Sequence, residues 1–78
     1  MVNPEDIKRW ITEKLPCEHI ELDGDGRHFQ AVIVSPAFSG KNTIQQHRLV
    51  YDALGTRMHE EIHALSMKTY TPEDWANR

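Results

Sequence analysis

Residues 18–36, EHIELDGDGRHFQAVIVSP, contain the pattern that decides the fold. Apolar and polar side chains alternate over residues 18–22, and the run from 28 to 35 is rich in β-branched side chains, as strands are. The intervening DGDG at residues 23–26 is a strong signal for a tight turn. Two strands joined by such a turn predict an antiparallel hairpin, which ends at Pro36 because proline cannot donate to a sheet ladder.

Helical patterns lie on both sides of the hairpin. Asn3, followed by proline and two acidic residues, is a typical helix start, and Pro16 ends the helix that follows. After the hairpin, apolar residues spaced by four predict a helical stripe that Gly55 interrupts. We therefore predict one helix before the hairpin and two after it, at residues 43–54 and 56–62.

A third strand completes the expected order of elements, and a turn with helix-start residues follows it. Residues 63–70 alternate as a strand does, and TPED at residues 71–74 repeats the helix-start pattern seen near the N-terminus. The last strand should run parallel to the second, because a helical crossover joins them. The order α-β-β-α-α-β thus predicts an α+β fold, in which helices cover one face of a small, three-stranded mixed sheet.

Composition and length limit the class of protein. A chain of 78 residues has room for a single domain, which we expect to span residues 1–78. The net charge of -3 lacks the basic excess that drives non-specific phosphate binding. Cys17 is the only cysteine, so no internal disulfide can form. Neither a signal-peptide pattern nor an apolar run long enough to span a membrane is present, so we expect a cytoplasmic protein that acts away from membranes.

Two of the five histidines are expected to meet at one edge of the sheet. Parallel neighbouring strands begin at the same edge, and His28 and His63 begin the second and third predicted strands. With strands about 4.8 Å apart, the two imidazoles would lie close together, although strict alternation would point them to opposite faces. Two neutral imidazoles at an exposed edge form half of a typical site for a soft metal.

Five segments, in order along the chain, resemble the BolA family. They are DGRHF at residues 25–29, FSGK at 38–41, QHRLVY at 46–51, IHALSMK at 62–68 and TPEDW at 71–75. The resemblance covers nearly the whole chain, and the joint pattern is specific. It implies an α-β-β-α-α-β fold similar to a type II KH domain, which agrees with the order deduced from periodicity and turns.

The resemblance also implies a partner and a cofactor. BolA-like proteins pair with monothiol, CGFS-type glutaredoxins and share a bridging 2Fe–2S cluster with them, in iron–sulfur cluster trafficking or iron sensing. The glutaredoxin cysteine and a bound glutathione supply ligands on one side, and the histidine that opens the last strand, here His63, supplies a ligand on the other. A second ligand usually comes from the loop between the first two strands. Residues 23–27 contain neither cysteine nor histidine, and His28 is the nearest candidate.

A single cysteine cannot hold such a cluster without a partner, because iron–sulfur clusters take four ligands, mostly thiolates. We therefore expect no cluster in the isolated chain, which should be a monomer or a weak homodimer. Histidine ligands raise the reduction potential of a cluster, and they make it more labile to acid because protons compete with the metal. These properties suit transfer or sensing better than storage.

Nucleic-acid binding is the alternative function. Lys41, Arg48 and Lys68 would form a basic patch on a KH-like fold, and the BolA family has been linked to transcriptional and stress-response control. However, FSGK is not the Gly-X-X-Gly clamp that KH domains place on nucleotides. An enzyme is not expected, because the sequence shows no nucleophile–base pair, phosphate-binding loop or recognisable pair of acids.

The remaining candidate residues have structural interpretations. We interpret Cys17 as a small buried hydrophobic residue, and Trp10 and Trp75 as packing anchors. The histidines other than His28 and His63 are interpreted as surface or helix residues.

Overall fold

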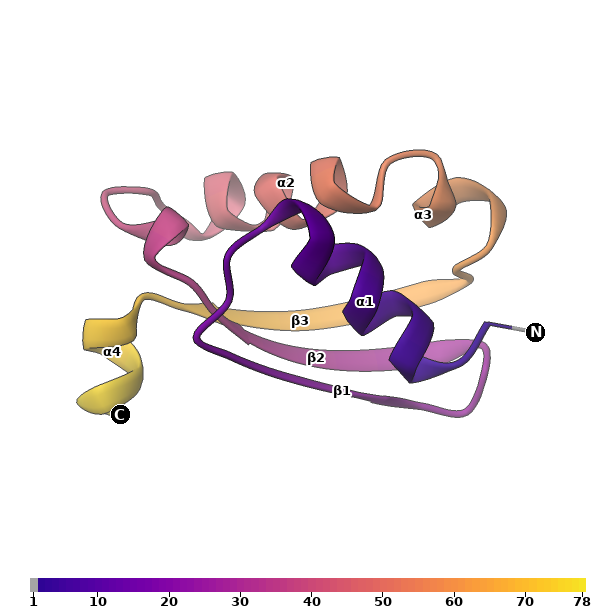
Figure 1. Cartoon of the computed structure of the whole chain (residues 1–78), viewed down its shortest axis with the longest axis horizontal. Helices are drawn as coiled ribbons and strands as arrows, with labels where there is room; N and C mark the ends of the chain where they lie inside the picture. Colours follow the sequence, from indigo (N-terminus) through magenta and orange to yellow (C-terminus); the bar gives the residue numbers. More distant parts are fainter. Residues whose placement is uncertain (1) are drawn as a thin grey trace.

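Helices cover one face of a three-stranded sheet in the computed structural model, which describes residues 2–78 (Figure 1). The predicted α+β order is confirmed, and no helix within the described residues is long and apolar enough to cross a membrane. In chain order, the elements are α1 (Pro4–Lys14), β1 (His19–Gly24), β2 (His28–Val34), the 3-10 turn η1 (Pro36–Phe38), α2 (Thr43–Leu54), α3 (Arg57–Glu60), β3 (Ala64–Tyr70) and α4 (Pro72–Ala76).

The sheet has the order β1-β2-β3. β1 pairs antiparallel with β2 through the predicted hairpin, and β3 runs parallel to β2 after the helical crossover, as predicted. The β1–β2 pairing continues two residues further than expected, because Gly24 still pairs with Phe29. A Cβ atom at Gly24 would lie 2.5 Å from both the backbone oxygen of His28 and the Phe29 ring, so only glycine fits where the hairpin closes.

Two boundaries after α2 also differ from the sequence prediction. The helix α3 is shorter than the predicted 56–62, because the N–H of Ile62 bonds back to the carbonyl of Arg57 and Ile62 then turns into the core. The strand β3 begins at Ala64, one residue later than predicted. His63 therefore lies in a bend between α3 and β3, outside regular secondary structure.

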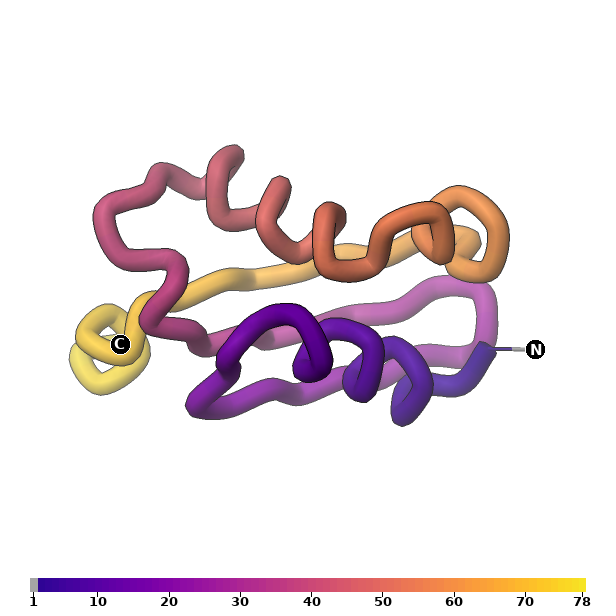
Figure 2. Tube along the Cα trace, turned by 45° about the horizontal axis from the view of Figure 1, so that its top comes forward, coloured from indigo at the N-terminus to yellow at the C-terminus, as the bar shows by residue number. Residues whose placement is uncertain are grey.

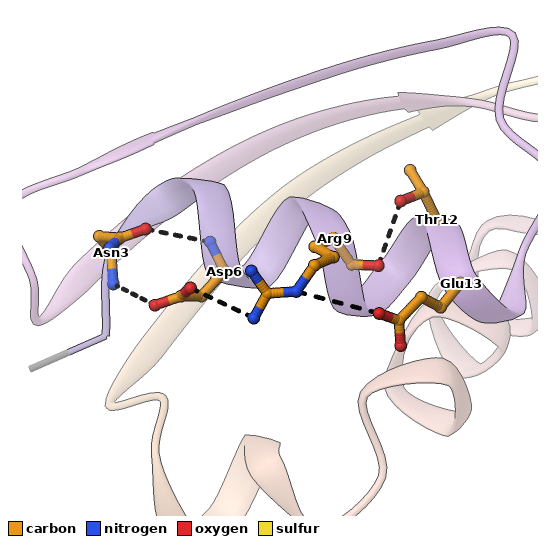
Figure 3. A network of polar contacts seen from close by, with 5 residues as sticks. All are labelled: Asn3, Asp6, Arg9, Thr12 and Glu13. Atoms are coloured by element: carbon orange, nitrogen blue, oxygen red, sulfur yellow. Dashed lines mark hydrogen bonds and ion pairs between the residues drawn. The ribbon is translucent and has the colours of Figure 1, made fainter.

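Polar side chains cap the helices where the sequence predicts helix starts. Asn3 and Asp6 form a reciprocal capping box at α1, and Asn42 and Gln45 form the same arrangement at α2. Figure 3 shows that Arg9 extends the polar network along α1, because it forms ion pairs with Asp6 and with Glu13, one turn further along the helix. These ion pairs are exposed and contribute little to stability, so the capping boxes are what define the two helix starts.

The core lies between the sheet and the two longer helices. Alternate residues of β2, namely Phe29, Ala31 and Ile33, are buried against this layer, as the sequence pattern predicts. α1 lies over the β1 side of the sheet, and α2 lies over the β3 side (Figure 2). The fully buried residues that the two helices contribute are Ile7, Ile11, Val50 and Leu54.

The opposite face of the sheet is open except at the end where α4 packs. Trp75 of α4 stacks on His19, with ring centroids 5.0 Å apart, and it also contacts Tyr70. His19 and Tyr70 flank Val34 in the sheet, and Val34 is fully buried although it points to the open face. Trp75 is therefore the packing anchor that the sequence predicts.

Candidate metal-ligating histidine pair

His28 and His63 lie side by side at the edge of the sheet where β2 and β3 begin. Their ring centroids are 5.7 Å apart, and the ring planes are nearly perpendicular, at 86°. His28 opens β2 directly after the hairpin turn, and the bend before β3 holds His63. The fold thus brings together two imidazoles that are far apart in the sequence.

The conflict expected between the faces of the two side chains does not arise, because His63 is not part of β3. His28 pairs in register with Ala64, the first residue of that strand. Alternation therefore starts at Ala64, and the preceding bend turns the His63 ring toward His28. The N–H of Ala64 donates to the carbonyl of Arg27 at 2.9 Å, which fixes the relative position of the two strand starts.

Both imidazoles are open to solvent. The side chain of His28 keeps 64% of its accessible surface, and His63 is also exposed. Within residues 2–78, no hydrogen bond or ion pair engages the ring nitrogens of His63. The pair is consequently accessible to a metal that another molecule presents.

Asp25 orders the hairpin next to His28. Its Oδ1 accepts hydrogen bonds from the backbone N–H groups of His28 and Arg27, both at 2.9 Å. The hydrogen bond from the His28 N–H has the largest effect on the pKa of the Asp25 carboxyl, which it lowers, and the bond from the Arg27 N–H lowers the pKa further. A lowered pKa means that the carboxylate stabilises the turn above the ordinary pKa of aspartate, and that this stability is lost as the pH falls through the lowered value.

The second carboxylate oxygen of Asp25 lies on the Nδ1 side of the His28 ring. Asp25 Oδ2 lies 3.8 Å from Nδ1 of His28 and therefore faces that side of the ring. A carboxylate on one side of an imidazole and a metal on the other is a common arrangement around protein metals. Nε2 of His28 is the ring nitrogen farther from this carboxylate.

Sequence reasoning missed Asp25 as a member of this site, although a signal was present. An aspartate before glycine in a turn commonly accepts hydrogen bonds from backbone groups two or three residues further on. Asp25 stands three residues before His28 in such a turn, so its proximity to the histidine was available from spacing alone.

The two histidines fit part of a metal coordination sphere. A metal about 2.1 Å from one nitrogen of each ring, at a tetrahedral angle, places the ring centroids about 5 Å apart. The observed separation of 5.7 Å is close enough that a small side-chain rotation reaches this geometry. Among residues 2–78, no group of three or more His, Cys, Asp or Glu side chains is placed to hold a metal ion. The described chain thus offers two ligands, and the others must come from a second molecule.

Cys17 lies away from the histidine pair. It precedes β1, whose first residue pairs with Val34 at the opposite end of β2 from His28. Its Sγ donates to the carbonyl of Leu15 at 3.4 Å, and burial raises the pKa of the thiol. Cys17 is partly buried and packs against the core, which is close to the hydrophobic role that the sequence suggests.

We expect Cys17 to react with iodoacetamide about fivefold more slowly in the folded chain than in the denatured chain at the same pH, because a raised pKa leaves less thiolate and burial limits access. Mass spectrometry of the alkylated fraction over time measures both rates. A short peptide with the sequence of residues 14–20 is the control for the intrinsic reactivity. Equal rates in the folded and denatured chains would contradict this assignment.

The three cations proposed for nucleic-acid binding are not brought together. Arg48 is exposed on α2, which covers the helix side of the sheet. Lys68 pairs in register with Val32, and strand alternation directs both to the open face. Lys41 is exposed in the loop before α2. Lys41 and Arg48 thus belong to one loop-and-helix segment, and Lys68 belongs to the other side of the sheet.

The fold and this site define a class of small α+β proteins that present two histidines at the edge of a mixed sheet. The family model for BolA-like protein matches residues 11–74, which is most of the chain. The chain belongs to this family, and the family resemblance seen in the sequence is confirmed.

Relatives agree with this assignment over most of the chain. Protein BOLA2 of Arabidopsis thaliana is 40% identical over 80 residues, which cover 96% of this chain and 85% of the relative. The solved structure of a bolA protein homologue from Coxiella burnetii matches with a TM-score of 0.83 and 47% identity, covering 97% of this chain and 99% of that one. The DNA-binding transcriptional regulator BolA of Escherichia coli (strain K12) is 36% identical over 52 residues, which cover 67% of this chain and 50% of the relative.

Proposed function

We propose that this BolA-like chain is the partner of a monothiol, CGFS-type glutaredoxin and donates His63 and His28 to a 2Fe–2S cluster that the two proteins share. The observation that carries the proposal is the exposed imidazole pair, with ring centroids 5.7 Å apart and the His63 nitrogens unengaged within residues 2–78. The family resemblance supports it, because it implies a partner of this kind.

The ligand count favours a shared centre over one held by this chain alone. A 2Fe–2S cluster takes four ligands, mostly thiolates, and this chain offers two imidazoles at one edge. The cysteine of the glutaredoxin and a glutathione thiolate would supply the two sulfur ligands. His63 and His28 would supply the two nitrogen ligands, and the Asp25 carboxylate beside Nδ1 favours Nε2 as the iron-binding nitrogen of His28.

The mixed ligand set suits a transfer or sensing role in the cytoplasm. A cluster supplies electron storage and visible absorption, and imidazole in place of thiolate adds no negative charge, so the reduction potential rises. Imidazole must be neutral to bind iron, so acid competes for it and loosens the cluster. In this role the chain supplies ligands and catalyses no reaction.

The test is a titration of a cluster-loaded CGFS glutaredoxin with this chain, followed by visible absorption and circular dichroism. We expect both spectra to change and to saturate at one chain per glutaredoxin, because the ligands of the iron change. The same titration with bovine serum albumin controls for dilution and non-specific loss of the cluster. Spectra that stay constant with the wild-type chain would reject the proposed function.

A second candidate function is nucleic-acid binding through Lys41 and Arg48. The Escherichia coli relative, which is a DNA-binding transcriptional regulator, favours it. The net charge of -3 and the location of Lys68 on the other side of the sheet speak against it. A gel-shift titration separates the two functions: salt-sensitive binding of a DNA duplex that is lost in Lys41→Glu and Arg48→Glu would support this candidate.

A further inference from the structure

The outer edge of β3 presents unpaired backbone groups. β3 is the last strand of the sheet and has a neighbour on one side only. The N–H of Ala64 bonds to Arg27, and the carbonyl of Tyr70 accepts from Ser35, so the even-numbered residues of β3 direct their backbone groups toward β2. The backbone groups directed outward belong to the odd-numbered residues, which are Leu65, Met67 and Thr69.

Nothing in the described chain pairs with this edge. Within residues 2–78, no backbone hydrogen bond outside the sheet ladder reaches Leu65, Met67 or Thr69. The strand contains no proline, and Lys68 is its only charged residue. Three outward N–H groups and three outward C=O groups therefore form a template on which another strand can pair.

The other edge of the sheet is protected by charge. β1 carries Glu21 and Asp23, and the Asp23 carboxylate accepts a hydrogen bond from the N–H of Gly24 at 2.9 Å. α1 also lies over this side of the sheet (Figure 2). Charged residues on an edge strand oppose pairing with another chain. β3 carries one charged residue, Lys68, so the edge of β3 is the less protected of the two.

We infer that the edge of β3 binds an extended segment of the protein that brings the metal to His63, so that the sheet gains a fourth strand. This inference rests on the proposed function. His63 directly precedes β3, and a segment paired with β3 would lie about 4.8 Å from it. Such a segment begins or ends beside the bend that holds His63, so strand pairing would hold the partner protein next to the histidine pair.

The side chains of β3 define the chemistry of this segment. Toward the helices, it meets the half-buried Leu65 and Met67, which favour apolar residues at alternate positions. On the open face, it meets Lys68, which has no ion-pair partner within residues 2–78. An acidic residue opposite Lys68 complements that charge. The segment therefore alternates apolar residues with polar or acidic ones.

Amide hydrogen exchange measured by NMR tests the inference at single residues. In the free chain, we expect the outward amides of Leu65, Met67 and Thr69 to exchange quickly, and the ladder amides of Ser66 and Lys68 to be protected. Adding cluster-loaded glutaredoxin should slow exchange at the three outward amides at least about tenfold, because each gains a hydrogen-bond acceptor. The inference is overturned if the outward amides are already protected in the free chain and this protection rises with chain concentration. That result would mean that a second copy of the chain occupies the edge.

A matched pair of variants tests the same edge. Met67→Pro removes an outward N–H and leaves the ladder to β2 intact, because proline is tolerated on the free side of an edge strand. Met67→Ala removes the same side chain but keeps the N–H. We expect Met67→Pro to weaken the association with cluster-loaded glutaredoxin at least about tenfold relative to Met67→Ala, as measured by isothermal titration calorimetry. Far-UV circular dichroism checks that both variants fold.

The outcomes separate this inference from the proposed function. If the glutaredoxin does not associate with the wild-type chain, or associates without a change in its visible spectra, the proposed function is overturned and the inference with it. If the spectra change but Met67→Pro and Met67→Ala bind equally, and the outward amides gain no protection, the inference alone is overturned. Protection of Leu65, Met67 and Thr69 on binding supports the inference even if Met67→Pro fails to fold.

Discussion

His63→Ala is expected to abolish the spectral change that the wild-type chain produces in a cluster-loaded glutaredoxin. Loss of a residue that only orients a ligand weakens metal binding about 10–100-fold, so loss of a ligand itself should weaken the shared cluster by more than about 100-fold. The free energy of unfolding should change by less than about 0.5 kcal/mol, because His63 is exposed and lies outside the ladder of β3. Visible circular dichroism and urea unfolding measure the two quantities.

His59→Ala is the matched control for this experiment. His59 is an exposed histidine on α3, four positions before His63, and it makes no contact with His28 comparable to the ring contact of His63. The His59→Ala chain should give the full spectral change. If His63→Ala and His59→Ala both retain it, His63 is not a ligand, and the proposed arrangement of the cluster is wrong.

Phe29→Ala is expected to destabilise the fold by about 3–5 kcal/mol. The Phe29 side chain is fully buried in the middle strand, where it pairs in register with Gly24 and Leu65. A domain of this length has a free energy of unfolding of only about 4–12 kcal/mol. The midpoint of thermal unfolding should therefore fall by at least about 12 °C, and calorimetry measures the shift.

Val32→Ala is the control for Phe29→Ala. Val32 lies on the same strand but points to the open face, where it is only partly buried, so its truncation should cost about 1 kcal/mol or less. An equal loss of stability in the two variants would contradict the division of the sheet into a core face and an open face. Since the pairing of β2 with β3 brings His28 and His63 together, the Phe29→Ala chain should also form the shared cluster poorly at temperatures near its unfolding midpoint.

The sheet could be predicted because turn residues and alternation act over short distances in the chain. The DGDG turn set the hairpin, and the burial of Phe29, Ala31 and Ile33 followed from period-two alternation. The parallel placement of β3 followed from the crossover rule. This topology was sufficient to predict that His28 and His63 meet.

The orientation of the histidine rings could not be predicted, because it depends on where α3 ends. The hydrogen bond from Ile62 to Arg57 closes that helix, and the burial of Ile62 in the core leaves His63 in a bend. These are tertiary effects with no local signal. By contrast, the separation of Lys68 from Arg48 was available from the sequence, because Lys68 alternates with Leu65 and Met67 on β3.

Trp75 and the histidine pair lie at opposite ends of the sheet. The end with Trp75 is therefore the better place to attach the chain to a surface for binding measurements. The longest dimension of the molecule is 35 Å, with α4 at one end and the start of α1 beside the hairpin turn at the other (Figure 1). A fluorophore or affinity tag joined after Arg78 stands on the α4 side, so a chain immobilised through it presents the imidazoles to solution. An attachment ahead of α1 would instead stand at the end of the sheet where β2 and β3 begin, which is the end that carries the imidazoles.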